Sequence, residues 1–294
     1  MVRVALVLVL LVVAAACGSP SSGQFGGLKV IAGENFWASI ATQLGGSKAS
    51  VHSVVSDPNA DPHEYETTTE DARAFANADL VILNGAGYDS WGSKLLAANP
   101  TSRRQALDVA QLLRKQAGDN PHFWYDPAAV IKVADAITAR YKTIDPAEAG
   151  YFDQLRADFA QALEPYSNEI ATIKQKYAGA SIGATESIFV YMADALSLKL
   201  TTPPAFMDAI AEGNDPPAGA VAQFHDQIAG NQIKVLIYNV QTATAVTTNL
   251  KTLAAAHHVP AVGVSETLQP QHAKFQDWQL AQLKRLESAL AASR

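Results

Sequence analysis

Residues 79–84 have the sequence DLVILN, a short apolar run that is typical of a buried β-strand. A similar run, KVLIYN, occupies residues 234–239, and shorter runs occur at 28–32 (LKVIA) and 260–264 (PAVGV). Stretches with helical periodicity separate these runs, and the first of them covers residues 35–44. Because buried strands that alternate with helices are typical of parallel sheets covered on both faces, we expect an α/β fold.

The middle of the chain breaks this alternation with one long amphipathic stretch. Residues 145–148 (DPAE) indicate a helix start, because an acid precedes a proline at the first helical position. Apolar and aromatic residues then recur at steps of three and four between Tyr151 and Tyr177, which predicts one continuous helical face. Pro165 should kink this helix or shift its start. We therefore expect two lobes, each with a mainly parallel sheet flanked by helices, joined by one long helix.

The first residues have the features of a secretory signal peptide. Residues 4–16 are apolar without a break, follow Arg3 and are too few to span a bilayer, which takes about 20 residues. The sequence AAAC at 14–17 resembles a bacterial lipobox, with Ala14 where leucine is usual. This resemblance implies that Cys17 is lipidated and that the Ser-, Gly- and Pro-rich residues after it form a flexible tether. The alternative is an ordinary signal peptide with an incidental cysteine.

These patterns divide the chain into five segments. We expect a signal peptide (1–16), a lipidated tether (17–27), an amino-terminal α/β lobe (28–144), a linking helix (145–178) and a carboxyl-terminal α/β lobe (179–294). The expected mature protein is a monomer held at the outer surface of the cell membrane by its lipid.

Composition and charge exclude several classes of protein. With 294 residues, 48% hydrophobic and 17% charged, the chain is neither disordered, collagen-like nor a coiled coil. The net charge of -6 and the absence of a basic stripe argue against nucleic-acid binding. Since there is one cysteine, an intramolecular disulfide and a zinc or redox site of the CxxC type are excluded.

Two loops each carry a histidine that directly follows a proline. Residues 57–65 (DPNADPHEY) include His63, and residues 120–127 (NPHFWYDP) include His122. The prolines stiffen both loops, and α/β folds place ligand groups in loops that follow strands. A neutral imidazole can bind a metal ion, although either histidine alone is better explained by a hydrogen bond to the backbone. Asp126 is expected to cap the helix that follows.

With these elements the chain resembles the cluster A-I metal-binding lipoproteins, the substrate-binding proteins of zinc and manganese ABC importers. The resemblance covers essentially the whole mature chain. It rests on DPHEY at 61–65, on ADLVILNG at 78–85 with Trp91 downstream, and on NPHFWYDP at 120–127. It implies that the first two metal ligands are His63 and His122.

The same resemblance implies two further ligands in the second lobe. In GATESIFVY at 183–191, Glu186 stands where zinc-type members usually have a histidine and manganese-type relatives also carry glutamate. In VGVSETL at 262–268, Glu266 takes the place of the family's aspartate and is one methylene longer. Either glutamate alone is better explained as a helix-capping or exposed carboxylate. The implied metal site is therefore His63, His122, Glu186 and Glu266, without catalytic residues.

Two imidazoles and two carboxylates can bind Zn²⁺, Mn²⁺ or Fe²⁺. Carboxylates that bind through both oxygens suit Mn²⁺, whereas Zn²⁺ binds more tightly than Mn²⁺ at most nitrogen and oxygen sites. The ligand set leans towards manganese without excluding zinc. We therefore expect an extracytoplasmic lipoprotein, not an enzyme, that carries one such ion between its lobes and delivers it to the membrane permease of an ABC importer.

Two alternative functions stay open. A surface adhesin or structural lipoprotein with a vestigial metal site would show no change in stability on adding metal. A metal-dependent hydrolase would need an open coordination position, and neither an HExxH motif nor a nucleophile elbow is present. Residues 239–242 (NVQT) could supply hydrogen bonds to the metal ligands or form an N-cap turn. The remaining histidines, among them His225, are weaker candidates for the site.

Overall fold

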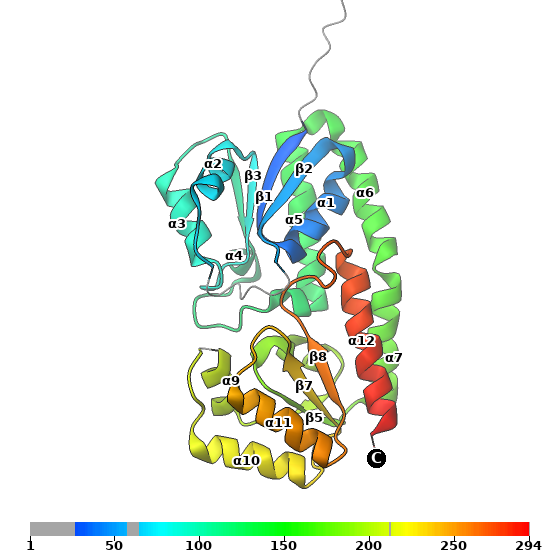
Figure 1. Ribbon diagram of the computed structural model, residues 1–294. Coiled ribbons are helices and arrows are strands. Elements are labelled where there is room, and N and C mark those ends of the chain that lie inside the picture. Colours follow the sequence, from blue (N-terminus) through cyan, green and yellow to red (C-terminus); the bar gives the residue numbers. More distant parts are fainter. Residues whose placement is uncertain (1–26, 58–64, 212, 294) are drawn as a thin grey trace, which may run out of the picture.

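The computed structural model describes residues 27–57, 65–211 and 213–293. The predictions for the signal peptide, Cys17 and His63 lie outside these ranges. Within them the chain forms two lobes, each built on a four-stranded parallel sheet (Figure 1). The expected α/β architecture is confirmed.

The first lobe has the strand order β2-β1-β3-β4. Its strands are β1 (Leu28–Glu34), β2 (Ala49–Val55), β3 (Leu80–Leu83) and β4 (Gln105–Asp108), and its helices are α1 (Asn35–Gly45), α2 (Thr69–Asn77), α3 (Ser90–Ala98), α4 (Val109–Leu113) and α5 (Pro127–Ile144). Val30 pairs with Leu80 in the central register. Successive side chains of a strand point to opposite faces, so Val30 packs into the core with α1 and α5, whereas Ile31 packs with α2 and α3. Figure 1 shows these two pairs of helices on either side of the sheet.

The second lobe repeats this strand order as β6-β5-β7-β8. Its strands are β5 (Ser181–Ala184), β6 (Lys199–Leu200), β7 (Val235–Asn239) and β8 (Ala261–Val264), and its helices include α8 (Val190–Ala195), α9 (Pro204–Ala211), α10 (Ala218–Ala229) and α11 (Ala245–Ala256). The runs predicted at 234–239 and 260–264 are β7 and β8, whereas the sequence analysis missed β6, as it missed β4 in the first lobe. Both missed strands are short edge strands whose residues are mostly exposed or half-buried, so neither shows a clear apolar run.

The expected single linking helix is divided in two by Pro165. Helix α6 covers Ala149–Ala162 and α7 covers Glu164–Tyr177. Pro165 occupies the first turn of α7, where the missing N–H costs least. Leu163 between them keeps helical angles, and its amide donates to the Phe159 carbonyl at 3.0 Å. The two helices therefore run end to end along both lobes (Figure 1).

A second helix lies beside this connection. Helix α12 (Phe275–Ala292) packs along α7, and its first turn reaches α1 of the first lobe. There the Phe275 amide donates to Ser39 Oγ at 3.0 Å, and Gln276 Nε2 donates to Gln43 Oε1 at 2.8 Å. The sequence analysis did not predict this contact. Because of it, both α12 and the α6–α7 pair connect the two lobes.

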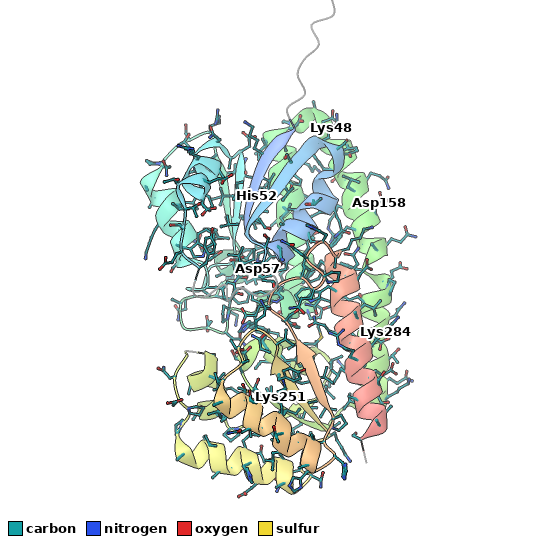
Figure 2. The ribbon with its side chains drawn as sticks, in the orientation of Figure 1. Lys48, His52, Asp57, Asp158, Lys251 and Lys284 are labelled. Atoms are coloured by element: carbon teal, nitrogen blue, oxygen red, sulfur yellow. The ribbon has the colours of Figure 1, made fainter. Side chains whose placement is uncertain are left out.

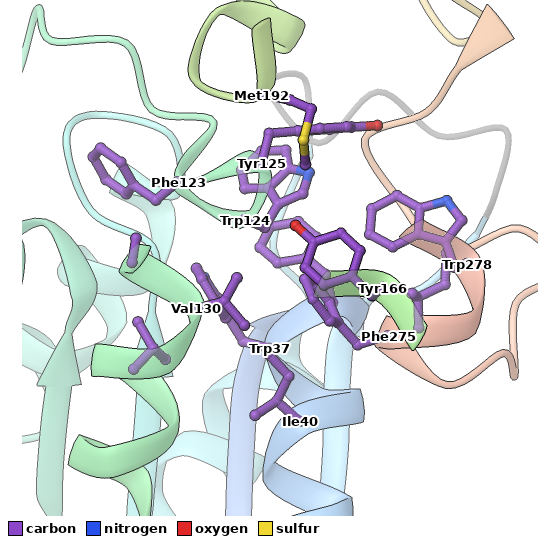
Figure 3. Packing of buried hydrophobic residues seen from close by; sticks show 14 of the residues in the cluster. Trp37, Ile40, Phe123, Trp124, Tyr125, Val130, Tyr166, Met192, Phe275 and Trp278 are labelled. Atoms are coloured by element: carbon purple, nitrogen blue, oxygen red, sulfur yellow. The ribbon is translucent and has the colours of Figure 1, made fainter. Parts of the chain in front are cut away.

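Aromatic side chains fill the space between the lobes (Figure 3). Trp124 stacks on Phe36 with ring centroids 4.0 Å apart and an interplanar angle of 21°. Tyr125 lies edge-on to Trp278 of α12, and its hydroxyl donates to the Ser265 carbonyl of the second lobe at 2.8 Å. The hydrophobic core is therefore continuous from one lobe into the other. Charged side chains such as Lys48, Asp158 and Lys284 lie on the outer surface (Figure 2).

None of the helices within the described ranges is long and apolar enough to cross a membrane.

Candidate metal centre

The carboxyl ends of the two sheets face each other across the lobe interface (Figure 1). In α/β folds such edges carry the ligand-binding groups. Three of the four predicted metal ligands lie here, namely His122, Glu186 and Glu266. The exposed fraction of each is 2% or less. Figure 2 places Asp57, the last described residue before the loop that contains His63, on the same side of the first lobe.

The imidazole of His122 has a defined orientation and tautomer. Its Nδ1 lies 2.6 Å from Asn120 Oδ1. The amide of Asn120 is itself fixed, because its Nδ2 donates to the Ser187 carbonyl at 2.8 Å. Since Asn120 Oδ1 can only accept, Nδ1 of His122 carries a proton, and in the neutral ring the lone pair is therefore on Nε2. A histidine that donates its second N–H to a fixed acceptor is the usual arrangement of a metal ligand.

Glu186 lies between β5 and the 3₁₀ helix Ser187–Phe189. It occupies the N-cap position of that helix, but its side chain makes no capping hydrogen bond. Instead, Thr242 Oγ1 donates to Glu186 Oε2 at 3.1 Å. With 2% exposure it is not a solvent-exposed carboxylate either. Glu186 is therefore neither a helix-capping residue nor an exposed carboxylate.

Glu266 follows β8 and is held from both lobes. The Tyr88 hydroxyl of the first lobe donates to its Oε2, and Asn239 Nδ2 of the second lobe donates to its Oε1 at 2.8 Å. Its backbone amide donates to Gln241 Oε1 at 2.7 Å. Glu266 is 1% exposed, so the interpretation as an exposed carboxylate is wrong. The interpretation of residues 239–242 as hydrogen-bonding partners of the two glutamates is confirmed.

The structure adds one acidic residue that the sequence analysis missed. Glu34 ends β1 at the same sheet edge and is fully buried. Burial, followed by the negative charges of Asp89 and Glu266, raises the pKa of Glu34 well above its usual value. The only signal in the sequence was an acid at the end of an apolar strand, a common position for a helix cap.

The neighbouring Asp89 has a clear structural role. Its carboxylate accepts from the amides of Asn84 at 2.6 Å and Gly85 at 2.8 Å. Burial raises the pKa of Asp89 to about 6, although these hydrogen bonds act in the opposite direction. Asp89 thus closes the turn that follows β3 and presents Tyr88 towards Glu266.

Within the described ranges, no three His, Cys, Asp or Glu side chains are grouped closely enough to hold a metal ion. The set of four ligands includes His63, which lies outside those ranges, and stays a prediction. His225 is exposed on α10 in the second lobe, consistent with its weaker candidacy. Asp126 caps α5 as predicted, since its Oδ1 accepts from the Ala128 amide at 2.9 Å.

A family model matches residues 30–289 of the chain; it is described as zinc-uptake complex component A, periplasmic. Over 156 residues the chain is 32% identical to the metal ABC transporter substrate-binding lipoprotein FimA of Streptococcus parasanguinis, covering 49% of this chain and 50% of that protein. It is 29% identical over 174 residues to the manganese ABC transporter substrate-binding lipoprotein PsaA of Streptococcus mitis, covering 55% and 56%. The chain thus spans about half the length of these curated relatives.

Solved structures show the same fold over nearly the whole chain. The crystal structure of ZnuA superposes with a TM-score of 0.72 at 23% identity, covering 91% of this chain and 100% of that chain. The substrate-binding protein FpvC of Pseudomonas aeruginosa, in complex with Mn²⁺, superposes with a TM-score of 0.71 at 18% identity, covering 90% and 98%. At these identities the similarity establishes the two-lobed fold.

Proposed function

This chain belongs to the zinc-uptake complex component A family, and we propose that it binds a divalent transition metal ion and delivers it to an ABC import permease. The cargo is one Mn²⁺ or Zn²⁺ ion, held between the two lobes. Relatives named as metal or manganese ABC transporter substrate-binding lipoproteins support this function. The protein acts as a carrier and not as an enzyme.

The orientation of His122 is the observation that carries this proposal. Its Nδ1–H is bound by Asn120, which presents Nε2 as a metal-binding atom. The ion is bound by His63 and His122 from the first lobe and by Glu186 and Glu266 from the second. Two carboxylates balance the charge of a divalent ion, and four protein ligands fill the tetrahedral coordination of Zn²⁺, which leaves no position for a reactive water on that ion. This closed coordination suits a carrier better than a hydrolase.

Binding between the lobes gives the permease a structural signal to recognise. Several hydrogen bonds cross the interface in this structure: the Leu268 amide donates to Asn35 Oδ1 at 3.0 Å, and Tyr88 donates to Glu266. A bound ion that links both lobes favours this closed arrangement over any open one. The two parallel helices α7 and α12 limit how far the lobes can separate, so loaded and empty protein differ by a modest lobe movement.

The proposed location follows from the first residues of the chain. Residues 1–16 direct export, and Cys17 is the lipidated residue that anchors the protein to the outer surface of the cell membrane. Residues 17–27 then tether a monomeric, metal-binding body near its permease partner. The curated relatives named as lipoproteins support this placement.

Thermal unfolding with separate metals tests the proposal. Purified protein is stripped of metal, and its melting temperature is followed with Zn²⁺, Mn²⁺ and Mg²⁺. A ligand at 100 times its dissociation constant adds about 2.7 kcal/mol to the free energy of unfolding. We expect a clear rise with Zn²⁺ or Mn²⁺ and none with Mg²⁺, which rarely binds imidazole. No rise with any of the three ions would refute the proposal and favour an adhesin or structural lipoprotein.

A further inference from the structure

The carboxyl of Glu34 is buried but takes no part in the hydrogen bonding of the described residues around it. It is the last residue of the central strand β1 and is fully buried. Neither of its carboxyl oxygens accepts or donates a hydrogen bond within the described part of the chain. It stands at the N-cap position of α1, yet its side chain does not cap that helix. Burying such a group costs several kcal/mol if it is ionised, so a structural role does not explain its presence.

The position of Glu34 is defined by its chain neighbours. Asn35, the next residue, accepts a hydrogen bond from the Leu268 amide at 3.0 Å. Leu268 is two residues beyond Glu266, so the end of β1 lies against the loop that carries this proposed ligand. The charge of Glu266 also acts on the Glu34 carboxyl. Glu34 therefore belongs to the edge of the first sheet that faces the proposed metal-binding residues.

Asp89 provides a comparison within the same lobe. It is equally buried and close enough to Glu34 to act on it electrostatically. Its oxygens, however, accept hydrogen bonds from the backbone amides of Asn84 and Gly85. The amides of Asn84 and Gly85 thus stabilise the charge of Asp89, whereas the carboxyl oxygens of Glu34 accept no hydrogen bond from another residue in the described part of the chain. A divalent cation supplies what Glu34 lacks.

We propose that Glu34 is a fifth residue of the metal site and contributes a third carboxylate to the bound cation. This inference rests on the proposed function. Carboxylate oxygens are preferred by Mn²⁺, and Mn²⁺ accepts more ligands than the four of a tetrahedral zinc site. Glu34 therefore determines selectivity: it strengthens Mn²⁺ binding more than Zn²⁺ binding. The sequence motifs of the site do not include this residue.

The affinities of the Glu34→Gln variant for Mn²⁺ and Zn²⁺ test this inference. Both dissociation constants are measured by competition with a metal-binding dye, for the original protein and for the variant. Glutamine keeps the size of the side chain and removes the charge. We expect Mn²⁺ affinity to fall by about 10–100-fold, as for other groups that support a metal, and Zn²⁺ affinity to fall by a smaller factor. The electron paramagnetic resonance spectrum of bound Mn²⁺ should also change.

Two further variants keep the test decisive. Glu169→Gln removes a carboxyl whose pKa is also raised, mainly by burial. The charged groups that act on Glu169 are Glu287, Lys284 and Lys176 and include none of the proposed ligands, so both affinities should stay unchanged. Glu34→Asp keeps the charge and retracts it by one methylene. It should therefore change the ratio of the Mn²⁺ affinity to the Zn²⁺ affinity in the same direction as Glu34→Gln, but by a smaller factor. Glu34→Asp alone decides the question if Glu34→Gln does not fold.

The outcomes separate this inference from the proposed function. If the original protein binds neither metal, the proposed function and the inference both fail. If it binds metal tightly but the Glu34 variants have the same ratio of Mn²⁺ affinity to Zn²⁺ affinity as the original protein, the inference alone is wrong and the carrier function stands. A selective loss of Mn²⁺ affinity in the Glu34 variants, with Glu169→Gln unchanged, supports the inference.

Discussion

His122 and Glu266 lie on opposite sides of the lobe interface, and different forces hold them in place. In the first lobe, the ring of His122 lies edge-on to Trp124 at 5.2 Å, and Trp124 in turn stacks on Phe36. In the second lobe, Glu266 is held by polar groups, with hydrogen bonds from Asn239 and, across the interface, from Tyr88. The first half of the site is part of a packed aromatic core, whereas the second half depends on side-chain hydrogen bonds.

This difference predicts how each half responds to mutation. Packed aromatic residues contribute large amounts of apolar burial to the stability of the whole fold, so disturbing them destabilises the protein before it affects the site. A hydrogen bond to a carboxylate contributes about 1.5–3 kcal/mol to stability, less than the burial of a large aromatic ring, but it orients the oxygens that would bind the ion. We therefore expect mutations in the packed first half of the site to lower mainly the stability of the protein. Mutations of hydrogen-bond donors in the second half should lower mainly the metal affinity.

The largest expected effect tests the packed half. Trp124→Ala removes a fully buried ring that stacks on Phe36, and should lower the free energy of unfolding by about 3–5 kcal/mol. Thr242→Val in the second lobe removes the hydrogen bond to Glu186, so stability should fall by about 1.5–2 kcal/mol while metal affinity falls about tenfold. Urea unfolding and metal titration of both variants check this. Equal losses of stability would contradict the comparison.

His122→Ala should give a somewhat smaller effect, mainly on metal binding. Site free energies of about 10–16 kcal/mol shared among four or five ligands assign roughly 2–4 kcal/mol to each, so affinity should fall by about 30- to 1000-fold. The metal-free variant should still unfold cooperatively, because the aromatic neighbours of His122 remain in place. His225→Ala, on the exposed face of α10, serves as the control and should bind metal normally. If His225→Ala were the damaging variant, the ligand assignment would be wrong.

The smallest expected effect concerns Asp89, the polar group that closes a turn beside the packed half. Its pKa is about 6 in the folded protein, raised by burial above the ordinary 3.8. A raised pKa means that the folded state binds the proton more tightly, so this contribution is present at low pH and is lost as pH rises through about 6. Lowering the pH from about 7 to about 5 should therefore stabilise the metal-free protein by about 1 kcal/mol through this residue.

Urea unfolding of Asp89→Asn at the two pH values checks the assignment. Asparagine takes up no proton, so the stability gain at the lower pH should be about 1 kcal/mol smaller than in the original protein. An equal gain in both proteins would assign it to other groups.

The elements that sequence analysis predicted well are those whose signal is local. The apolar runs at 28–32 and 79–84 became β1 and β3, and Asp126 with its following proline became the N-cap of α5. Pro165 shifted a helix start as expected, because the chemistry of proline is independent of its neighbours in space. Edge strands β4 and β6 were missed, since a strand that is half exposed does not need an apolar run.

The residues around the candidate site could be predicted only in part. The histidine loops and the two glutamates were identified by resemblance to a known family, and the structure places three of these four residues at one interface. Glu34 was missed because its local sequence is that of an ordinary helix cap. Its burial beside the loop of Glu266 depends on contacts between residues more than 200 positions apart.

By itself, the sequence determined the alternation of strands and helices and the start of α5 at Asp126, because apolar periodicity and proline geometry act within a few residues. Only the tertiary structure decided the tautomer of His122, the bond from Tyr88 to Glu266 and the isolation of Glu34. The physical reason is that a hydrogen bond or a buried charge depends on which groups the folded chain brings within a few ångströms, and sequence spacing does not encode that proximity.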